Sequence, residues 1–266
     1  METAERLRFR TAFDGDAAAY DGGRPPHPPW VFERLASQCA LGDGTRVLEV
    51  GPGTGQVTVP MAELGALVTA VELGANLAAR LRTNTANLPV EVVVGDFETI
   101  PLPHPSQFDL AVSANAFHWL DPVPALRRLA DALRPGGWLA LWWNVFRDPD
   151  RPDPFSEAIQ PVYEELIATG DRSRGAMPYA LRHDAVRADI AAAERFGPVS
   201  VDDRRSELSF SPEQVRAMFA TYSEWRAQPE ARRAEALDRI ESIARGQFGG
   251  VVSRPRRTVL YVAQRR

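Results

Sequence analysis

Three closely spaced glycines directly after an apolar run are the first residues of this sequence that could do chemistry. Gly51, Gly53 and Gly55 follow the run 46–50, and the acid Glu72 stands at the end of a second apolar run, 67–71. Backbone without Cβ atoms can approach a ligand closely. A carboxylate at the end of the second strand of an open α/β fold can accept hydrogen bonds from both hydroxyls of a ribose. The pattern therefore predicts a nucleotide-like ligand.

The residues around the glycines disfavour two phosphate-containing ligands. A dinucleotide-binding turn has the spacing Gly-x-Gly-x-x-Gly, but Gln56 occupies the third position and Gly55 comes one residue early. A P-loop ends in Gly-Lys followed by Ser or Thr, and this turn has no lysine. An NAD-dependent dehydrogenase therefore remains only an alternative, which nicotinamide binding would test.

The elements that must position these residues alternate along the chain. Short apolar runs, mostly of β-branched or aromatic residues, alternate with segments of helical periodicity, which predicts a doubly wound, mostly parallel sheet with helices on both faces. Asp96 ends the third predicted strand as Glu72 ends the second, and such strand ends form the ligand crevice of open α/β folds. The predicted strands are 46–50, 67–71, 90–94, 108–114 and 138–143, and the predicted helices between them are 56–64, 74–84 and 122–133.

The flanking segments predict further elements. A helix is expected around 30–39, followed after the sheet by helices near 155–169, 180–194 and 211–225. Ser211, Pro212 and Gln214 have the spacing of a capping box at the start of the last of these helices. The polar segment 199–210 is expected to be an edge strand, and 257–264 a final strand.

Composition narrows the class of protein. The chain has 266 residues, 44% of them hydrophobic and 25% charged, with a net charge of −4, which is ordinary for a globular protein and gives no basic excess for a nucleic-acid partner. The charges of 232–245 alternate in sign, as on a solvated helix face. Cys39 is the only cysteine, so neither an intrachain disulfide nor a cysteine-rich metal site is expected, and no metal is predicted. Without an apolar signal segment or a run of membrane-spanning length, we expect a soluble, cytoplasmic protein without a membrane partner.

Five segments together resemble a known motif series. They are VLEVGPGTGQ (47–56), VTAVE (68–72), GDFETIPLP (95–103), FDLAVSANAFHWLD (108–121) and LRPGGWLALWW (133–143). This series is similar to that of class I S-adenosylmethionine-dependent methyltransferases, in particular the small-molecule branch with trans-aconitate-type and ubiquinone/menaquinone-type enzymes. The likeness covers about residues 10–145. Segment 13–28 also resembles the N-terminal segment of that branch, with His27 where the pattern has a tyrosine.

The resemblance implies a Rossmann-like, doubly wound sheet of seven strands, mostly parallel with an antiparallel last strand, plus a helical cap. We expect one methyltransferase domain over 1–266. Its parts are an N-terminal lid and helix (1–45), a cofactor-binding core (46–145), a substrate cap with helices (146–256) and a closing strand (257–266).

The resemblance also implies a cofactor site for S-adenosylmethionine, with S-adenosylhomocysteine as product. By family analogy Glu49 holds the amino group, the three glycines line the methionine and ribose portions, and Glu72 binds the ribose hydroxyls. The remaining expected contacts are Leu73 and Phe97 on either side of the adenine, Asp96 at its exocyclic amine, Asn115 near the sulfonium, and Tyr20 and Arg24 on the lid. Plain core packing is the alternative for Leu73 and Phe97.

The methyl acceptor is expected to be a small molecule methylated at oxygen. A hydroxyl acceptor would need a general base, for which His118 is the first candidate and His27 the second; a structural histidine is the alternative for His118. A carboxylate acceptor would need no base. Trp143, Asn144 and Arg147 are expected near the acceptor, while His104 and His183 are expected at the surface.

Two other functions fit the same resemblance. One is a cofactor-retaining enzyme that catalyses a non-methylating step, such as a cyclisation, and the other is a cofactor-binding module without catalysis. Fold alone does not decide among them. The oligomeric state is not predicted from the sequence.

Overall fold

The computed structural model describes residues 14, 22–102, 104–146, 148–167 and 177–266. The chain forms two compact units. The first, here called the sheet unit, comprises Pro26–Asn144, Tyr179–Asp203 and Thr258–Arg266; the second, the helical unit, comprises Val145–Pro178 and Arg204–Arg257 with the residues up to Pro25. Tyr20, Arg147 and most of the predicted lid lie outside the described residues.

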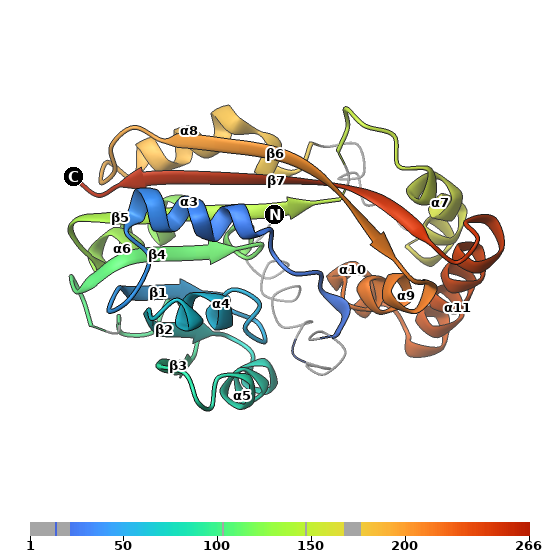
Figure 1. The fold of residues 1–266 in the computed structure, drawn as a ribbon, viewed down its shortest axis with the longest axis horizontal. Coiled ribbons are helices and arrows are strands. Elements are labelled where there is room, and N and C mark those ends of the chain that lie inside the picture. Colours follow the sequence, from blue (N-terminus) through green and yellow to red (C-terminus); the bar gives the residue numbers. More distant parts are fainter. Residues whose placement is uncertain (1–13, 15–21, 103, 147, 168–176) are drawn as a thin grey trace. The chain divides into compact units, whose positions relative to one another are not determined.

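A seven-stranded sheet runs in the order β3-β2-β1-β4-β5-β7-β6 (Figure 1). The pairs β1–β2, β1–β4, β2–β3 and β4–β5 are parallel, while β7 runs opposite to its neighbours (Figure 1). The predicted fold class is therefore confirmed, with the polar strand β6 at an edge as expected. The strands are β1 (Arg46–Val50), β2 (Leu67–Glu72), β3 (Val90–Val94), β4 (Phe108–Ala114), β5 (Leu133–Val145), β6 (Ser200–Phe210) and β7 (Val252–Gln264).

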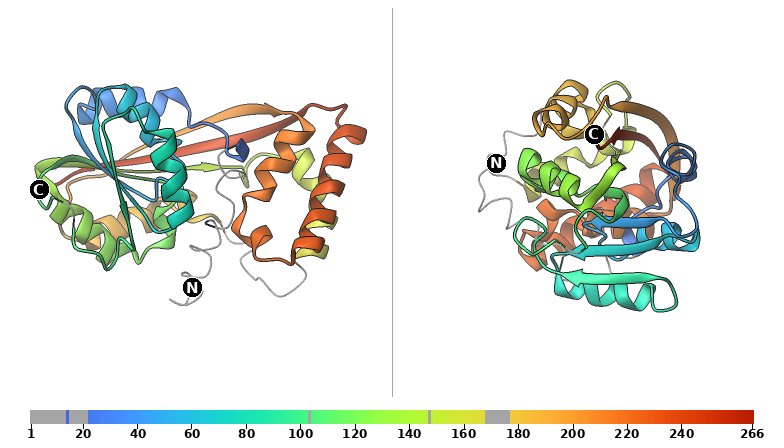
Figure 2. Two further views of the ribbon diagram at one scale, coloured as in Figure 1. Left: turned by 90° about the horizontal axis from the view of Figure 1, so that it is seen from below. Right: turned by 90° about the vertical axis from the view of Figure 1, so that its left-hand side faces the viewer.

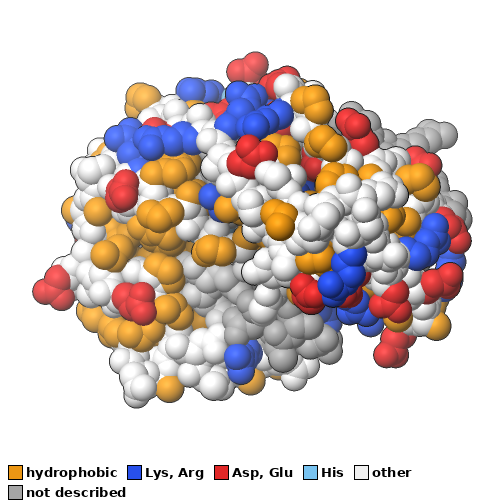
Figure 3. All heavy atoms as spheres, turned by 45° about the vertical axis from the view of Figure 1, so that its right-hand side comes forward, with side chains coloured by type: hydrophobic (Ala, Val, Ile, Leu, Met, Phe, Trp, Pro, Cys, Tyr) orange, Lys and Arg blue, Asp and Glu red, His pale blue; other side chains and the backbone are white. Residues whose placement is uncertain are grey.

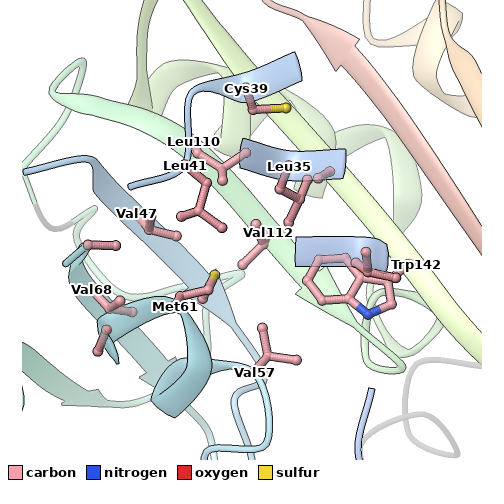
Figure 4. Close-up of a cluster of buried hydrophobic side chains, with 14 of the residues drawn as sticks. Leu35, Cys39, Leu41, Val47, Val57, Met61, Val68, Leu110, Val112 and Trp142 are labelled. Carbon is pink, nitrogen blue, oxygen red and sulfur yellow. The ribbon is translucent and has the colours of Figure 1, made fainter. Parts of the chain in front are cut away.

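Helices cover both faces of the sheet in the sheet unit (Figure 2). On one face lie α3 (Pro29–Cys39), α4 (Thr58–Glu63) and α5 (Ala75–Asn84), and on the other α6 (Pro122–Ala132) and α8 (His183–Ala192). Alternate residues of each strand point to the α3 face, where they pack with helix side chains (Figure 4). The labelled members of this core include Leu35, Met61, Val47, Val112 and Trp142. Because successive strand residues alternate between faces, the neighbours of these strand residues point to α6 and α8.

Two strands are longer than predicted. Strand β5 begins at Leu133, five residues before the predicted start at 138, because Leu133 already pairs with Phe108 ahead of a register shift between Phe108 and Leu110. Arg134 also donates to Asp109 at 2.6 Å, which holds this first part of β5 against β4. Strand β7 likewise begins at Val252 rather than at 257. The two extensions consist largely of arginine, proline, glycine and serine, so they gave no alternating apolar signal.

The helical unit contains α7 (Pro154–Leu166), α9 (Pro212–Ala220), α10 (Ser223–Arg226) and α11 (Glu230–Gln247) around its own apolar core. The capping box predicted at Ser211 and Gln214 is present. Arginines of α9 and α11 pair with acids, as Arg245 does with Glu213 and Glu241. Figure 3 shows basic and acidic side chains interspersed on the face it draws. The ion pairs of α11 fit the solvated, mixed-charge helix face that the sequence indicated.

Two further searches cover the described part of the chain only. Its helices include none with the length and apolar character needed to cross a bilayer. Its His, Cys, Asp and Glu side chains form no group of three or more that could hold a metal ion.

Candidate functional site

The glycine turn connects β1 to α4 at the carboxyl end of the sheet. Gly51, Gly53 and Gly55 have φ angles of 73°, 60° and 108°, in the region that residues with a Cβ rarely adopt. A Cβ on Gly51 would lie 2.5 Å from the Cβ of Ala116, and one on Gly55 would lie 2.9 Å from Leu81 Cδ1. The sequence predicted that these glycines serve close approach of a ligand. The structure shows that Gly51 and Gly55 are required by the backbone conformation and by the protein's own packing.

Glu72 closes this turn from the neighbouring strand. Its buried carboxylate accepts hydrogen bonds from the backbone N–H of Gly53 at 3.0 Å and of Gly74 at 2.9 Å, one on each oxygen. Gly74 is the N-cap of α5, so one charge joins the glycine turn to the start of a helix. Each carboxylate oxygen has two lone-pair directions, so one oxygen can accept more than one hydrogen bond.

Glu49 is a second buried carboxyl beside the first. It is 1% exposed, and its Oε2 accepts a hydrogen bond of 2.6 Å from the hydroxyl of Thr58 on α4. Burial raises the pKa of Glu49 to about 8, and the negative charge of Glu72 adds to the rise, while the Thr58 bond acts in the opposite direction. Glu49 therefore holds a proton at neutral pH in the ligand-free protein, and a nearby cation would favour its ionised form.

Asn115 joins two strand ends next to the glycine turn. Its φ of 54° turns the chain sharply after β4. Its backbone N–H donates to the carbonyl of Trp142 at 2.9 Å, and its Oδ1 accepts from the backbone N–H of Asn144 at 2.8 Å. Because Ala116 lies against Gly51, the segment after β4 is at the same edge of the sheet as the turn and the two acids.

The residues expected around the adenine differ in how deeply they are buried. Phe97 is 2% exposed, and the guanidinium of Arg128 lies over its ring at 5.3 Å from the centroid. This is a core position, so the geometry favours the alternative of core packing over adenine contact for Phe97. Leu73 is partly exposed, as is Asp96, whose Oδ1 accepts from the backbone N–H of Glu98 at 3.0 Å.

Two consecutive tryptophans at the end of β5 each donate to a histidine. Trp143 Nε1 donates to His118 Nδ1 at 3.0 Å, and Trp142 Nε1 donates to His27 Nδ1 at 2.9 Å. The two indoles point to opposite faces of the sheet because they are neighbours in a strand. The Asn144 amide also approaches His27 Nδ1, at 3.1 Å. Neither tryptophan–histidine pair was predicted from the sequence.

The indole bond decides the tautomer of His118. An indole N–H is a donor only, so the ring nitrogen facing it must carry a lone pair, and the proton of the neutral ring is on Nε2. His118 is exposed, and its ring lies 4.6 Å from that of Trp119. The lone pair that a general base needs is thus engaged by Trp143. This geometry disfavours the predicted role of His118 as a base, and the same argument applies to His27.

The other predicted residues have partners within their own units. Arg24 belongs to the helical unit, where it donates to the Thr221 carbonyl at 3.1 Å and lies over the Tyr222 ring. His104 is exposed as predicted. His183, in contrast, is only partly exposed, because its Nδ1 hydrogen-bonds the hydroxyl of the buried Tyr261 at 2.7 Å. His183 is therefore at the surface only in part, with 35% of its side chain exposed.

The central part of the sheet unit matches a known family. A model described as "Methyltransferase domain" matches residues 48–141, the segment from β1 to β5 that contains the glycine turn, Glu72 and Asn115. Over residues 48–141 the chain is therefore similar to a methyltransferase domain. The resemblance to class I methyltransferases that the motifs indicated is thereby confirmed.

Named relatives are similar to about half of the chain. An uncharacterised methyltransferase of Mycobacterium tuberculosis is 38% identical over 144 residues, which are 54% of this chain and 56% of the relative. A ubiquinone biosynthesis O-methyltransferase of Xanthomonas campestris is 35% identical over 130 residues, 46% of this chain and 54% of the relative. The chain thus spans about half the length of the curated relatives it matches.

Among solved structures, a putative methyltransferase from an antibiotic biosynthesis pathway of Anabaena variabilis has a TM-score of 0.63 at 17% sequence identity. The aligned residues make up 90% of this chain and 98% of the chain in that structure. At this identity the likeness shows the fold alone, and it extends beyond the methyltransferase domain.

The contact between Gly51 and Ala116 predicts a position-specific loss of stability. Gly51→Ala should destabilise the protein by about 1–3 kcal/mol more than Gly44→Ala, because overpacking adds to the backbone strain that both share. Gly44 is the matched control, since its φ is 71° and a Cβ there would meet no atom within 4 Å. Urea unfolding measures both losses. The double substitution Gly51→Ala with Ala116→Gly should recover the excess, whereas equal losses at 44 and 51 would contradict the contact.

The raised pKa of Glu49 predicts that the stability of the ligand-free protein depends on pH. The native carboxyl keeps its proton up to about pH 8, while its usual pKa is 4.5, so the native state binds more protons in this window and loses stability as pH rises. Glu49→Gln should remove this loss of up to about 1.4 kcal/mol per pH unit. The measurement is urea unfolding at several pH values between 5 and 8.

Glu63→Gln, at the exposed end of α4, is the control. The free energy of unfolding of Glu49→Gln relative to wild type should grow with pH, and that of Glu63→Gln should stay constant. Parallel curves for wild type and Glu49→Gln would show that Glu49 has no raised pKa.

Proposed function

We propose that this chain transfers a methyl group from S-adenosylmethionine to a small-molecule acceptor, at oxygen. The observation that carries the proposal is the pair of buried carboxyl groups, Glu49 and Glu72, beside the glycine turn of a methyltransferase domain. The ubiquinone O-methyltransferase of Xanthomonas campestris, similar over about half its length, supports oxygen as the acceptor atom.

The chemistry of this donor set fits the cofactor. Glu72 is a carboxylate whose orientation is fixed by Gly53 and Gly74, and a carboxylate at a strand end is the group that accepts hydrogen bonds from ribose hydroxyls in open α/β folds. Glu49 is a buried carboxyl that a nearby ammonium would convert to its ionised form, which suits an amino-acid moiety. The turn has no lysine that could bind a phosphate, and S-adenosylmethionine contains no phosphate.

When bound, S-adenosylmethionine supplies a methyl carbon that is already activated by its sulfonium leaving group. The protein then has to hold the acceptor in line with that carbon and to exclude water. In our proposal Glu49 holds the amino group of the cofactor and Glu72 its ribose, and the strand-end segment around Asn115 lies toward the reacting centre. Leu73 and Asp96 are proposed at the adenine, without Phe97.

The remaining expectations stay proposals from the sequence. They are the lid with Tyr20 and Arg24, acceptor contacts from Trp143, Asn144 and Arg147, a role of residues 146–256 in recognising the acceptor, and a cytoplasmic location.

The ribose assignment of Glu72 has a direct test. Glu72→Ala should weaken binding of S-adenosylhomocysteine by roughly 1.5–3 kcal/mol, the scale of a hydrogen bond to a charged group. Because the substitution also removes the bonds to Gly53 and Gly74, calorimetry should compare S-adenosylhomocysteine with its 2′,3′-dideoxyribose analogue. Wild type should prefer the parent ligand, and Glu72→Ala should bind both alike.

If the preference for the ribose hydroxyls survives in the variant, they have another partner and the assignment to Glu72 is wrong. Equal binding of both ligands already in wild type would also contradict it.

The activity itself is tested with methyl-labelled cofactor and a panel of small acids, phenols, quinols and amines. Methyl transfer adds one methyl group to the acceptor and releases S-adenosylhomocysteine. A product of unchanged mass would instead indicate a non-methylating step on the same fold. Cofactor binding with no turnover on any acceptor would indicate a binding module.

A further inference from the structure

The turn that follows β3 is held from outside by one arginine. Arg128, on α6, donates from Nε to the carbonyl of Phe97 at 2.8 Å and from Nη2 to the carbonyl of Ile100. Its guanidinium also lies over the Phe97 ring, 5.3 Å from the centroid. Hydrogen bonds from a charged donor are stronger than those between neutral groups. A single side chain of α6 therefore restrains a turn that lies about 30 residues earlier in the chain.

Short-range contacts close the same turn. The carbonyl of Asp96 accepts from the backbone N–H groups of Thr99 and Ile100, both at 2.9 Å. Ile100 also lies against the start of the turn, since a Cβ on Gly95 would be 2.5 Å from Ile100 Cγ2. The carbonyls that Arg128 binds belong to the middle and the end of this turn. Arg128 thus fixes a segment whose two ends already touch.

A second hydrogen bond joins the turn to the same helix. The side chain of Glu98 accepts from the backbone N–H of Asp121, the N-cap of α6, at 2.8 Å. Arg128 follows about two helical turns later. Buried residues such as Leu126 and Leu129 anchor α6 in the core. The turn after β3 is therefore supported at two points by an anchored helix, as a precisely held binding segment requires.

The position of the turn in the sheet places it next to Glu72. Val94 pairs with Glu72, and the backbone N–H of Gly95 donates to the Glu72 carbonyl at 2.9 Å. In the proposed function Glu49, at the end of β1, holds the amino group of the cofactor, and Glu72, at the end of β2, holds its ribose. Neighbouring strands lie about 4.8 Å apart, and β3 follows β2 in the sheet. The group attached to the ribose, the adenine, therefore falls to the turn after β3.

We propose that Arg128 is a positioning residue for the adenine end of the cofactor, because it holds the turn 95–100 in the conformation that receives the base. The inference rests on the proposed function and adds a residue to it. Arg128 lies between the fourth and fifth segments that carry the family resemblance, so the resemblance gives it no role. A turn that is ordered beforehand does not have to be fixed when the base binds, which favours binding.

The restraint on the turn can be measured without ligand. In the full chain, Arg128→Met should raise the amide hydrogen-exchange rates of Thr99 and Ile100 by about tenfold or more, because methionine cannot donate to either carbonyl. Exchange at Val112, in the buried strand β4, should stay the same and show that the opening is local. NMR measures each rate. Unchanged exchange at both amides of the turn overturns the proposal.

Binding then separates a positioning role from a purely structural one. Calorimetry should compare S-adenosylhomocysteine with S-ribosylhomocysteine, which has the same ribose and amino acid but no base. The ratio of the two Kd values reports the contribution of the adenine. Arg128→Met should reduce this ratio by about tenfold, the effect of having to order the turn on binding, and leave the Kd of S-ribosylhomocysteine unchanged. If both Kd values change by the same factor, or neither changes, the proposal is overturned.

Two more variants complete the experiment. Arg127→Met is the matched control, since Arg127 is the exposed neighbour on α6 and donates to the Ala192 carbonyl at 3.4 Å. It should keep the ratio and the exchange rates of wild type. If Arg128→Met does not fold, Arg128→Gln carries the same expectations, because its side chain is too short to reach both carbonyls. A wild-type ratio in the folded Arg128 variant overturns the proposal.

The behaviour of wild type distinguishes this proposal from the proposed function. If wild type binds the two ligands equally well, the adenine has no site and the role of Arg128 is overturned, while a ribose site remains. If neither ligand binds, the cofactor assignment fails and the role of Arg128 toward a base fails with it, although hydrogen exchange still reports whether Arg128 holds the turn. Cofactor binding without methyl transfer to any acceptor contradicts the proposed function alone.

Discussion

One buried carboxylate organises the functional edge of this protein. Glu72 accepts hydrogen bonds from the N–H groups of Gly53 and Gly74, so one charge holds both the glycine turn and the N-cap of α5. Gly51 belongs to this turn, and its close approach to Ala116 positions the segment after β4. Three of the parallel strands therefore end in loops that depend, directly or through one contact, on this group. The neighbouring Glu49 has its pKa raised by its own burial, and the negative charge of Glu72 adds to this rise.

The sequence was informative where local chemistry decides structure. Helical and strand periodicity, the capping box at Ser211 and the position of Glu72 at a strand end all follow from residues within a few positions of one another. The extension of β5 back to Leu133 does not, because it depends on pairing with Phe108 and on Arg134 reaching Asp109. Phe97 shows the same limit, since only the fold reveals that Arg128 covers its ring.

The roles of the histidines were the least predictable part of the site. Residue type alone makes His118 a candidate base, but its proton position depends on an indole 25 residues along the chain. His27 depends on an indole 115 residues away. The sequence did contain one signal, the pair of tryptophans at the end of a strand. Neighbouring strand residues point to opposite faces, so the two indoles can bind two different partners. Hydrogen-bond direction cannot be read from such a pattern without the fold.

The contact between Gly51 and Ala116 also limits how this domain can diversify. A side chain larger than alanine at position 116 would press on a backbone that already has no room for a Cβ. The loop that carries His118 thus begins at a position where change is costly, because Ala116 packs against the glycine turn. Under the proposed function, cofactor binding and acceptor recognition are in this way tied to one shared pair of small residues.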